Sequence, residues 1–259
     1  MNGQKSWQEL ISYYDEKKIS TRRKIVSYGP TKVGKSRFGS TIPGDICIID
    51  TDHSLAGLID KHVPVLTISR DDVINSRIKV YDTIYAFIRA LRDKEEPFKT
   101  TFPNIKTLMI DGVTSMADLF LDEVMLDQRI GKERRDPLYQ KATFDEYGAI
   151  SSRLETIFTI IDDLDINIYV TAGLKMDKDE TSGLIVSMPD IVGSFRQKIG
   201  HRFDAVLYFH VEKGKYYATC TSNSSYKFPC GIRGWIGPDE IENPTFDRIF
   251  DPKNFGERP

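Results

Sequence analysis

One stretch near the start of the chain has the residue types and the spacing that bind phosphate. It reads Gly-Pro-Thr-Lys-Val-Gly-Lys-Ser over residues 29–36 and fits the P-loop pattern G-x-x-x-x-G-K-S. Two glycines allow a tight turn whose N–H groups point at phosphate oxygens, and the helix that follows adds partial positive charge. We expect Lys35 to reach the β- and γ-phosphates and the Ser36 hydroxyl to ligate Mg²⁺. The predicted nucleotide-binding residues are Gly29, Pro30, Thr31, Lys32, Val33, Gly34, Lys35, Ser36 and Arg37.

Carboxylates follow two apolar segments further along the chain. Residues 105–111 form an apolar run that ends in Asp111, which is typical of the strand that holds Mg²⁺ beside a P-loop. Residues 46–50 form a second apolar run, and Asp52 lies two positions beyond its end. A carboxylate outside the metal site can orient the attacking water, and Asp52 is our candidate for this base. Asp50 is the second candidate, unless its role is to cap the following turn.

Strands and helices alternate around these residues. The patterns predict strands at 24–28, 46–50, 63–68, 105–111 and 166–172, and helices at 81–92, 113–129, 147–164 and 191–201. Strand, P-loop and helix followed by further β/α units predict a mostly parallel sheet with helices on both faces. The carboxyl ends of parallel strands share one edge of the sheet, so the side chains that follow these strands should meet there. The predicted catalytic group is Lys35, Asp52, Asp111 and Thr171, with Ser36 and Asp111 as metal ligands.

Thr171 ends one of these strands, and its hydroxyl has either a structural role or a contact with the γ-phosphate.

The tail of the chain differs from the rest. Residues 204–211, 215–222 and the Gly/Pro-rich 229–244 predict an antiparallel extension with a hairpin turn at 212–215. The expected fold class is therefore α/β, a P-loop NTPase with a mostly parallel sheet and an antiparallel C-terminal extension.

The composition of the 259 residues is that of an ordinary globular protein, with 40% hydrophobic and 29% charged residues. The formal net charge is −2, so any contact with nucleic acid must come from local basic patches. Cys47, Cys220 and Cys230 lack disulfide or zinc spacing, and we expect buried or half-buried free thiols in a reducing cytoplasm. No apolar run approaches the roughly 20 residues of a membrane span, and no signal-peptide pattern is present.

The chain as a whole resembles the phage-type RecA-core ATPases, the compact Sak-type single-strand annealing and recombination proteins. Residues 46–55 resemble the segment of RecA-type ATPases in which a strand leads to a catalytic carboxylate, usually Glu, and Asp52 stands at that position here. The P-loop, the strand before Asp111 and residues 200–207 complete the resemblance, which spans roughly residues 22–235. It implies a RecA-like core that binds ATP with Mg²⁺, forms a homo-oligomer as a ring or a filament, and acts on single-stranded DNA. It also implies a single-stranded-DNA-binding protein as a partner, no membrane contact, and a bacterial host cytoplasm.

Two polar segments, 127–147 and 174–198, lie where this resemblance places DNA-contacting loops. A charged run is often only a solvated loop, and that alternative stays open. The DNA-binding candidates are Lys132, Arg134, Arg135 and Lys141, with Tyr139 and Phe144 available for stacking on bases. The basic residues that would reach a neighbour's γ-phosphate, unless they form ordinary surface ion pairs, are Arg196, Lys198 and Arg202.

Residues 1–20 carry an apolar stripe that predicts a short helix, which packs either on its own domain or on a neighbouring protomer as an oligomerisation element. Residues 21–259 are expected to form a single RecA-like ATPase domain. Three functions are compatible with the motifs. We favour a DNA-stimulated recombination ATPase over a small-molecule or nucleotide kinase and over a helicase-loader or switch-type NTPase. The guanine-binding pattern N-K-x-D is missing, which favours ATP over GTP.

Overall fold

The computed structural model of the chain describes residues 22–55, 63–127, 129–130, 133–134, 136, 140–178, 185–192, 195–222 and 230–256. The strands are β1 (Lys24–Tyr28), β2 (Asp45–Asp50), β3 (Val65–Thr67), β4 (Ile105–Asp111), β5 (Arg129–Ile130), β6 (Glu133–Arg134), β7 (Asn167–Lys178), β8 (Ile185–Asp190), β9 (Ala205–Glu212), β10 (Lys215–Thr219), β11 (Gly231–Ile232) and β12 (Glu240–Glu242). The helices are α1 (Lys35–Gly39), α2 (Arg70–Ile74), α3 (Val80–Asp93), α4 (Val113–Asp127), α5 (Phe144–Asp162), α6 (Phe195–Arg202) and α7 (Phe246–Ile249), followed by a short 3₁₀ turn, η4 (Pro252–Asn254).

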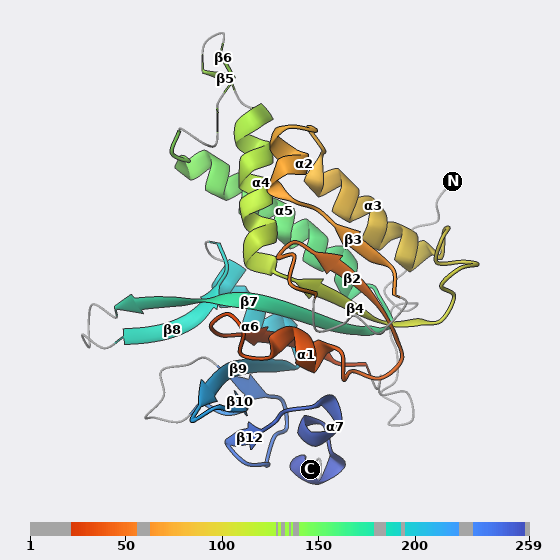
Figure 1. Cartoon of the computed structure of the whole chain (residues 1–259), viewed down its shortest axis with the longest axis vertical. Helices are drawn as coiled ribbons and strands as arrows, with labels where there is room; N and C mark the ends of the chain where they lie inside the picture. Colours follow the sequence, from red (N-terminus) through yellow and green to blue (C-terminus); the bar gives the residue numbers. More distant parts are fainter. Residues whose placement is uncertain are drawn as a thin grey trace, which may run out of the picture.

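One large sheet runs through the molecule (Figure 1). Its strand order is β12-β10-β9-β1-β7-β4-β2-β3, with β8 beside β7 and β11 beside β9. The strands from β9 to β3 pair in parallel, whereas β10, β11 and β12 add an antiparallel extension at one side. The expected α/β class, with a mostly parallel sheet and an antiparallel C-terminal extension, is confirmed.

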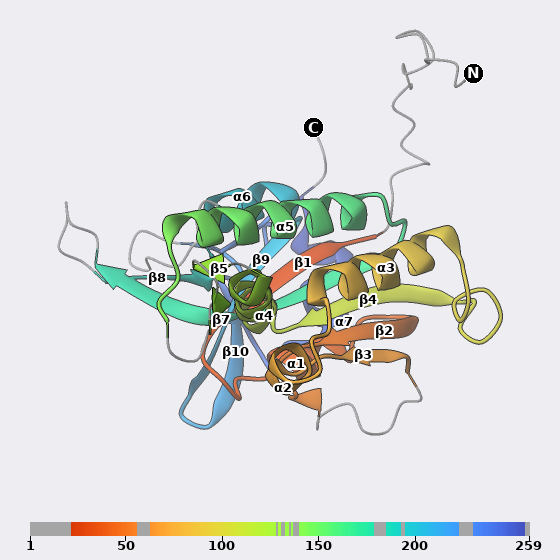
Figure 2. The same ribbon diagram turned by 90° about the horizontal axis from the view of Figure 1, so that it is seen from above.

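Successive side chains of each strand point to opposite faces of the sheet, so a buried strand presents apolar side chains on both faces. Other elements of the fold cover each face. On one face, Val26, Leu108 and Ile168 pack against α3, α4, α5 and α6 in a large apolar cluster. On the other face, Ile25 and Ile48 join a smaller cluster with α1, α7 and the antiparallel strands. Figure 1 shows α3, α4 and α5 above β7 and α1 below it, and Figure 2 shows α3 and α5 from above, next to the strands.

The expected strands and helices are present, and their ends differ most where short-range hydrogen bonding decides them. Helix α5 begins at Phe144, three residues before the expected start. The Glu146 carboxylate accepts a hydrogen bond from the Thr143 N–H at 2.5 Å and so closes a capping box. The expected polar loop over 174–198 was wrong in part. Strand β7 continues to Lys178 and pairs with β8 as an antiparallel ribbon. This pairing gives the backbone N–H and C=O groups of exposed, polar residues their hydrogen-bond partners.

The predictions about the cysteines and the N-terminus have different outcomes. Cys47, Cys220 and Cys230 are buried free thiols, as expected. The expected helix within residues 1–20 lies outside the described residues. Among the residues that the structure describes, no helix is long and apolar enough to cross a membrane.

Candidate functional site

The P-loop joins the end of β1 to the start of α1, and its shape depends on glycine. Gly29 has φ 152°, and a Cβ added there would lie 2.2 Å from the carbonyl oxygen of Phe209 in β9. Gly34 has φ 93° and Lys32 has φ 62°, so both adopt the left-handed conformation. The loop therefore curls tightly over the end of β1, in the conformation that turns successive N–H groups toward an anion.

Lys35 crosses this loop. Its ammonium group donates hydrogen bonds to the carbonyl oxygens of Gly29 at 3.0 Å and Pro30 at 2.6 Å. Burial lowers the pKa of Lys35, whereas the nearby carboxylates of Asp111 and Asp52 raise it. The cation thus lies within electrostatic reach of both candidate catalytic carboxylates.

A buried tyrosine anchors the start of α1. The Tyr169 hydroxyl donates to the carbonyl oxygen of Lys35 at 2.7 Å and lies 2.6 Å from the Ser27 Oγ. Tyr169 is completely buried and packs at 5.4 Å, ring centroid to ring centroid, against Phe38 of α1. The residue that fixes the start of α1 therefore lies outside the P-loop motif, on strand β7.

Asp111 ends β4 and receives hydroxyl groups from three other segments. Ser36 Oγ donates to its two oxygens at 3.2 and 2.9 Å, Ser54 Oγ donates at 3.1 Å, and Thr171 Oγ1 donates at 2.7 Å. Thr171 also accepts a hydrogen bond from the Gly112 N–H at 2.8 Å. In this arrangement the Thr171 hydroxyl positions Asp111.

The donor set at this point fits Mg²⁺. Ser36 and Asp111 supply a hydroxyl and a carboxylate, the hard oxygen ligands that Mg²⁺ prefers, and Mg²⁺ commonly takes its remaining ligands from phosphate and water. Among the described residues, no group of three or more His, Cys, Asp or Glu side chains is arranged to hold a metal by itself. Ser36 and Asp111 would therefore hold Mg²⁺ together with the phosphates of a nucleotide, and the ion would supply charge neutralisation there.

Burial raises the pKa of the Asp111 carboxyl, although hydrogen bonds from Thr171, Ser36 and Ser54 lower it. The folded protein therefore holds a proton at Asp111 more tightly than the unfolded chain does. The ionised group disfavours folding above its folded pKa, and this effect disappears below the unfolded pKa of about 4.

We expect Asp111→Asn to raise the melting temperature of the nucleotide-free protein at pH 8, with the difference vanishing near pH 3.5, as measured by calorimetry. It should also lower Mg²⁺-dependent hydrolysis at least about 100-fold. A lower melting temperature at pH 8 would mean that the three hydroxyl hydrogen bonds outweigh the cost of burial.

Asp52 lies in the turn after β2 and is held in place by α4. The Ser115 hydroxyl donates to Asp52 Oδ1. Gly112 permits this approach, because a Cβ at that position would lie 2.5 Å from the Asp52 Cγ. Thr51 fixes the same turn, since its hydroxyl donates to the carbonyl oxygen of Gly112 at 2.7 Å. A carboxylate is thus presented beside Asp111 from a neighbouring strand.

Asp50 has a different role from Asp52. It is 3% exposed, and its Oδ1 accepts the N–H groups of Asp52 at 3.2 Å and His53 at 2.8 Å. These bonds stabilise a turn in which His53 has φ 52°. Asp50 therefore caps the turn that presents Asp52, which is the structural alternative that the sequence left open.

A cavity of about 610 Å³ adjoins this edge of the sheet. It begins at Thr51, His53 and Ser115 and extends along α4 to the start of α5. Its lining includes the ion pair between Arg70 and Asp122, with Nε to Oδ2 at 2.7 Å, and apolar side chains of α4. No pattern in the sequence indicates this cavity, because its walls come from four separate segments.

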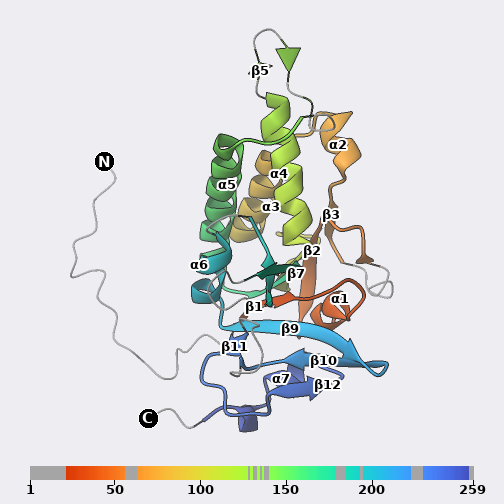
Figure 3. The ribbon, with the colours of Figure 1, turned by 90° about the vertical axis from the view of Figure 1, so that its left-hand side faces the viewer.

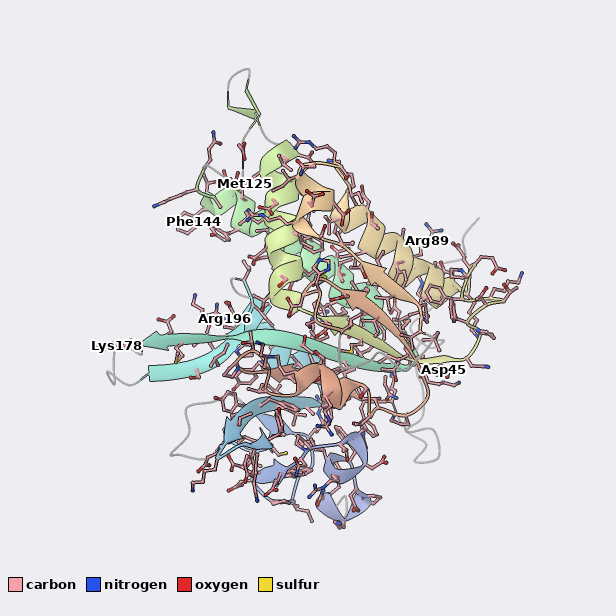
Figure 4. All side chains as sticks on the ribbon, viewed as in Figure 1. Asp45, Arg89, Met125, Phe144, Lys178 and Arg196 are labelled. Atoms are coloured by element: carbon pink, nitrogen blue, oxygen red, sulfur yellow. The ribbon has the colours of Figure 1, made fainter. Side chains whose placement is uncertain are left out.

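The structure describes the candidate DNA-binding residues only in part. Lys132, Arg135, Tyr139 and the side chain of Arg134 lie outside the described residues. The backbone of Arg134 belongs to the β5–β6 hairpin, which projects beyond the end of α4 (Figure 3). Lys141 is exposed and lines the cavity, and Phe144 is 95% exposed at the first turn of α5 (Figure 4).

The candidate trans-acting basic residues lie on α6. Arg202 pairs with Asp162 of α5 at 3.0 Å. Arg196 donates from Nε to the carbonyl oxygen of Ile191 at 3.1 Å. The side chain of Lys198 lies outside the described residues. Both described arginines thus have partners within their own chain, which is the ordinary alternative that the sequence left open.

Comparison with known proteins identifies the family. A family model described as an AAA domain, AAA_24, matches residues 21–229. A comparison with curated proteins finds no match. Among solved structures, a KaiC-like protein from the hyperthermophilic archaeon Pyrococcus horikoshii OT3 aligns over 86% of this chain and 89% of its own, with 10% identity and a TM-score of 0.42. The chain belongs to the AAA domain family, and it combines a P-loop with a mostly parallel sheet.

Proposed function

We propose that the protein binds ATP with Mg²⁺ and hydrolyses it with Asp52 as the base that orients the attacking water. The observation that carries this proposal is the position of Asp52, which Ser115 holds beside Asp111 and within electrostatic reach of Lys35. A P-loop alone accounts for nucleotide binding. A second carboxylate, outside the Ser36–Asp111 pair, supplies the base that hydrolysis needs to orient the attacking water. Lys35 would neutralise charge that develops on the transferred phosphoryl group.

We further propose that hydrolysis responds to single-stranded DNA at the start of α5. Phe144 is 95% and Tyr147 is 44% exposed, and the two lie on the same side of the helix because they are three positions apart. Exposed aromatic rings stack on unpaired bases, and the exposed Lys141 nearby suits the phosphate backbone. Tyr147 and Lys141 also line the cavity that begins at Ser115, so the cavity connects the proposed DNA surface with the residue that holds Asp52. Lys132, Arg134 and Arg135 remain candidate DNA-binding residues on the sequence pattern alone.

Steady-state ATP hydrolysis with and without single-stranded DNA tests this proposal. We expect DNA to raise the rate and DNA affinity to fall steeply with salt, because bound cations release counterions from the phosphates. Phe144→Ala should weaken DNA binding at least about fivefold through the loss of one stacked base. Ile236→Ala removes an equally hydrophobic side chain that is 66% exposed on the C-terminal extension, and it should leave DNA affinity unchanged. A rate that is indifferent to DNA would reject this part of the proposal.

The cavity supports a second candidate, phosphoryl transfer to a small acceptor. Its volume of about 610 Å³ suits a small molecule, and Thr51, His53 and Ser115 place one end beside Asp52. In that case Asp52 would take a proton from the acceptor hydroxyl rather than from water. Product analysis separates the two, because release of inorganic phosphate at the rate of ATP consumption, with no phosphorylated acceptor from a cell extract, excludes the kinase.

The proposal also includes assembly into a homo-oligomer, with a single-stranded-DNA-binding protein as a further partner. A cation from a neighbouring protomer would then complete the site, with Arg196, Lys198 and Arg202 as the candidates. Electron microscopy with ATP and single-stranded DNA measures the assembly directly. A monomer under these conditions would favour the helicase-loader or switch-type alternative.

A further inference from the structure

The hairpin formed by β9 and β10 extends one face of the sheet past the P-loop. Phe209 and Ala218 lie opposite each other in this hairpin, as do Val211 and Tyr216, so the four side chains share one face. Phe209 and Ala218 are completely buried in the cluster that contains Val33 of the P-loop. Val211 and Tyr216 continue that face outward and are 44% and 37% exposed. Figure 3 shows this hairpin next to α1.

Tyr216 packs directly on the P-loop. A Cβ added to Gly34 would lie 3.4 Å from the Tyr216 Cδ1 and 3.9 Å from its Cε1, so the ring covers the open side of this glycine. No described residue forms a hydrogen bond with the Tyr216 hydroxyl, in contrast to Tyr217, whose hydroxyl lies 3.3 Å from Glu242. An exposed apolar surface made of an aromatic ring and a valine thus adjoins the phosphate-binding loop.

We infer that Tyr216 and Val211 form the nucleobase subsite of the ATP site, with the purine base stacked on the Tyr216 ring. This inference rests on the proposed binding of ATP at the P-loop. A nucleotide whose phosphates lie in the loop must place its base within one nucleoside length of it, and the hairpin offers an exposed aromatic surface at that distance. On the other side of the P-loop, Asp52 and Asp111 approach Lys35, which leaves that side to the γ-phosphate and Mg²⁺.

Stacking on Tyr216 predicts which nucleobases the site prefers. An aromatic ring contacts the face of a base rather than its hydrogen-bonding edge, so the contact depends on the area of the base. Purine nucleotides should therefore bind more tightly than pyrimidine nucleotides, whereas Tyr216 itself should discriminate little between adenine and guanine.

The test compares the affinity of the full-length protein for ATP and for inorganic tripolyphosphate, both with Mg²⁺, by calorimetry. Tyr216→Ala should weaken ATP binding about tenfold and leave tripolyphosphate binding unchanged, because only ATP carries a base. Tyr216→Phe keeps the ring and should bind ATP like the wild type. Tyr217→Ala is the matched control, since Tyr217 lies on the opposite face of β10, where its ring stacks on His210 at 5.5 Å, and it should leave both affinities unchanged.

Two results would overturn the inference while leaving the proposed function intact. Equal ATP affinity in Tyr216→Ala and wild type would place the base elsewhere. An equal loss of ATP and tripolyphosphate affinity would mean that Tyr216 only shapes the P-loop through Gly34. A wild-type protein that binds neither ligand would instead overturn the proposed ATP site together with this subsite.

Discussion

Asp52→Asn should lower the rate of ATP hydrolysis by about 10²–10⁴-fold while ATP binding is retained, because a positioned base contributes on this order. The amide keeps the size of the carboxylate and still accepts the Ser115 hydroxyl, so the turn after β2 should keep its shape. What it loses is the basicity that orients and deprotonates water. Single-turnover hydrolysis and a separate measurement of ATP affinity distinguish the chemical step from binding.

The control for this variant is Asp82→Asn, which removes an exposed carboxylate from the first turn of α3 without touching the site. It should hydrolyse ATP like the wild type. Ser115→Ala gives a graded companion, because it leaves the Asp52 carboxylate in place but frees it from α4, and we expect a smaller loss than for Asp52→Asn. Full turnover in Asp52→Asn would show that another group activates the water.

Lys35→Ala should abolish detectable ATP binding without unfolding the protein. The ammonium is the one basic side chain that the P-loop directs across its own carbonyl oxygens, and it faces the two carboxylates that surround the proposed phosphate position. Because burial lowers the pKa of Lys35, the folded state disfavours its charge. Its removal should therefore leave the melting temperature of the nucleotide-free protein unchanged or slightly higher.

Thermal unfolding with and without ATP and Mg²⁺ measures this directly. A ligand at 100 times its Kd stabilises the folded state by about 2.7 kcal/mol, which the wild type should show as a higher melting temperature. Lys35→Ala should show no such increase. An undiminished increase in the variant would mean that the loop backbone alone holds the nucleotide.

The sequence predicted the elements of this fold well because most of them carry their own local signals. Residues 105–111 were expected as a strand that ends in Asp111, and β4 has these bounds. Helix α3 begins and ends one residue outside the expected range of 81–92. The β7–β8 ribbon was missed because its outer part is exposed and polar, and only its pairing partner makes it a strand.

The residues of the candidate site also fall into those with a local sequence signal and those without one. Lys35, Ser36 and Asp111 could be proposed from the sequence because a contiguous P-loop motif and an apolar strand with a terminal carboxylate are visible there. Ser54, Ser115 and Tyr169 were not found, since a single hydroxyl in a turn, a helix or a buried strand has no local signature. Their roles follow from hydrogen bonds to residues between 57 and 134 positions away in the chain.

The sequence by itself determined that this protein has a P-loop motif, a carboxylate at the end of an apolar strand, and the strands that lead to both, because each of these depends on neighbouring residues. Only the tertiary structure decided which carboxylate is presented and which one caps a turn. The backbone N–H groups of residues 52 and 53 engage Asp50, whereas Ser115 on α4 holds Asp52. The structure alone also brought Tyr216 onto Gly34, because the pairing of β9 with β1 places a hairpin from the end of the chain beside its first loop.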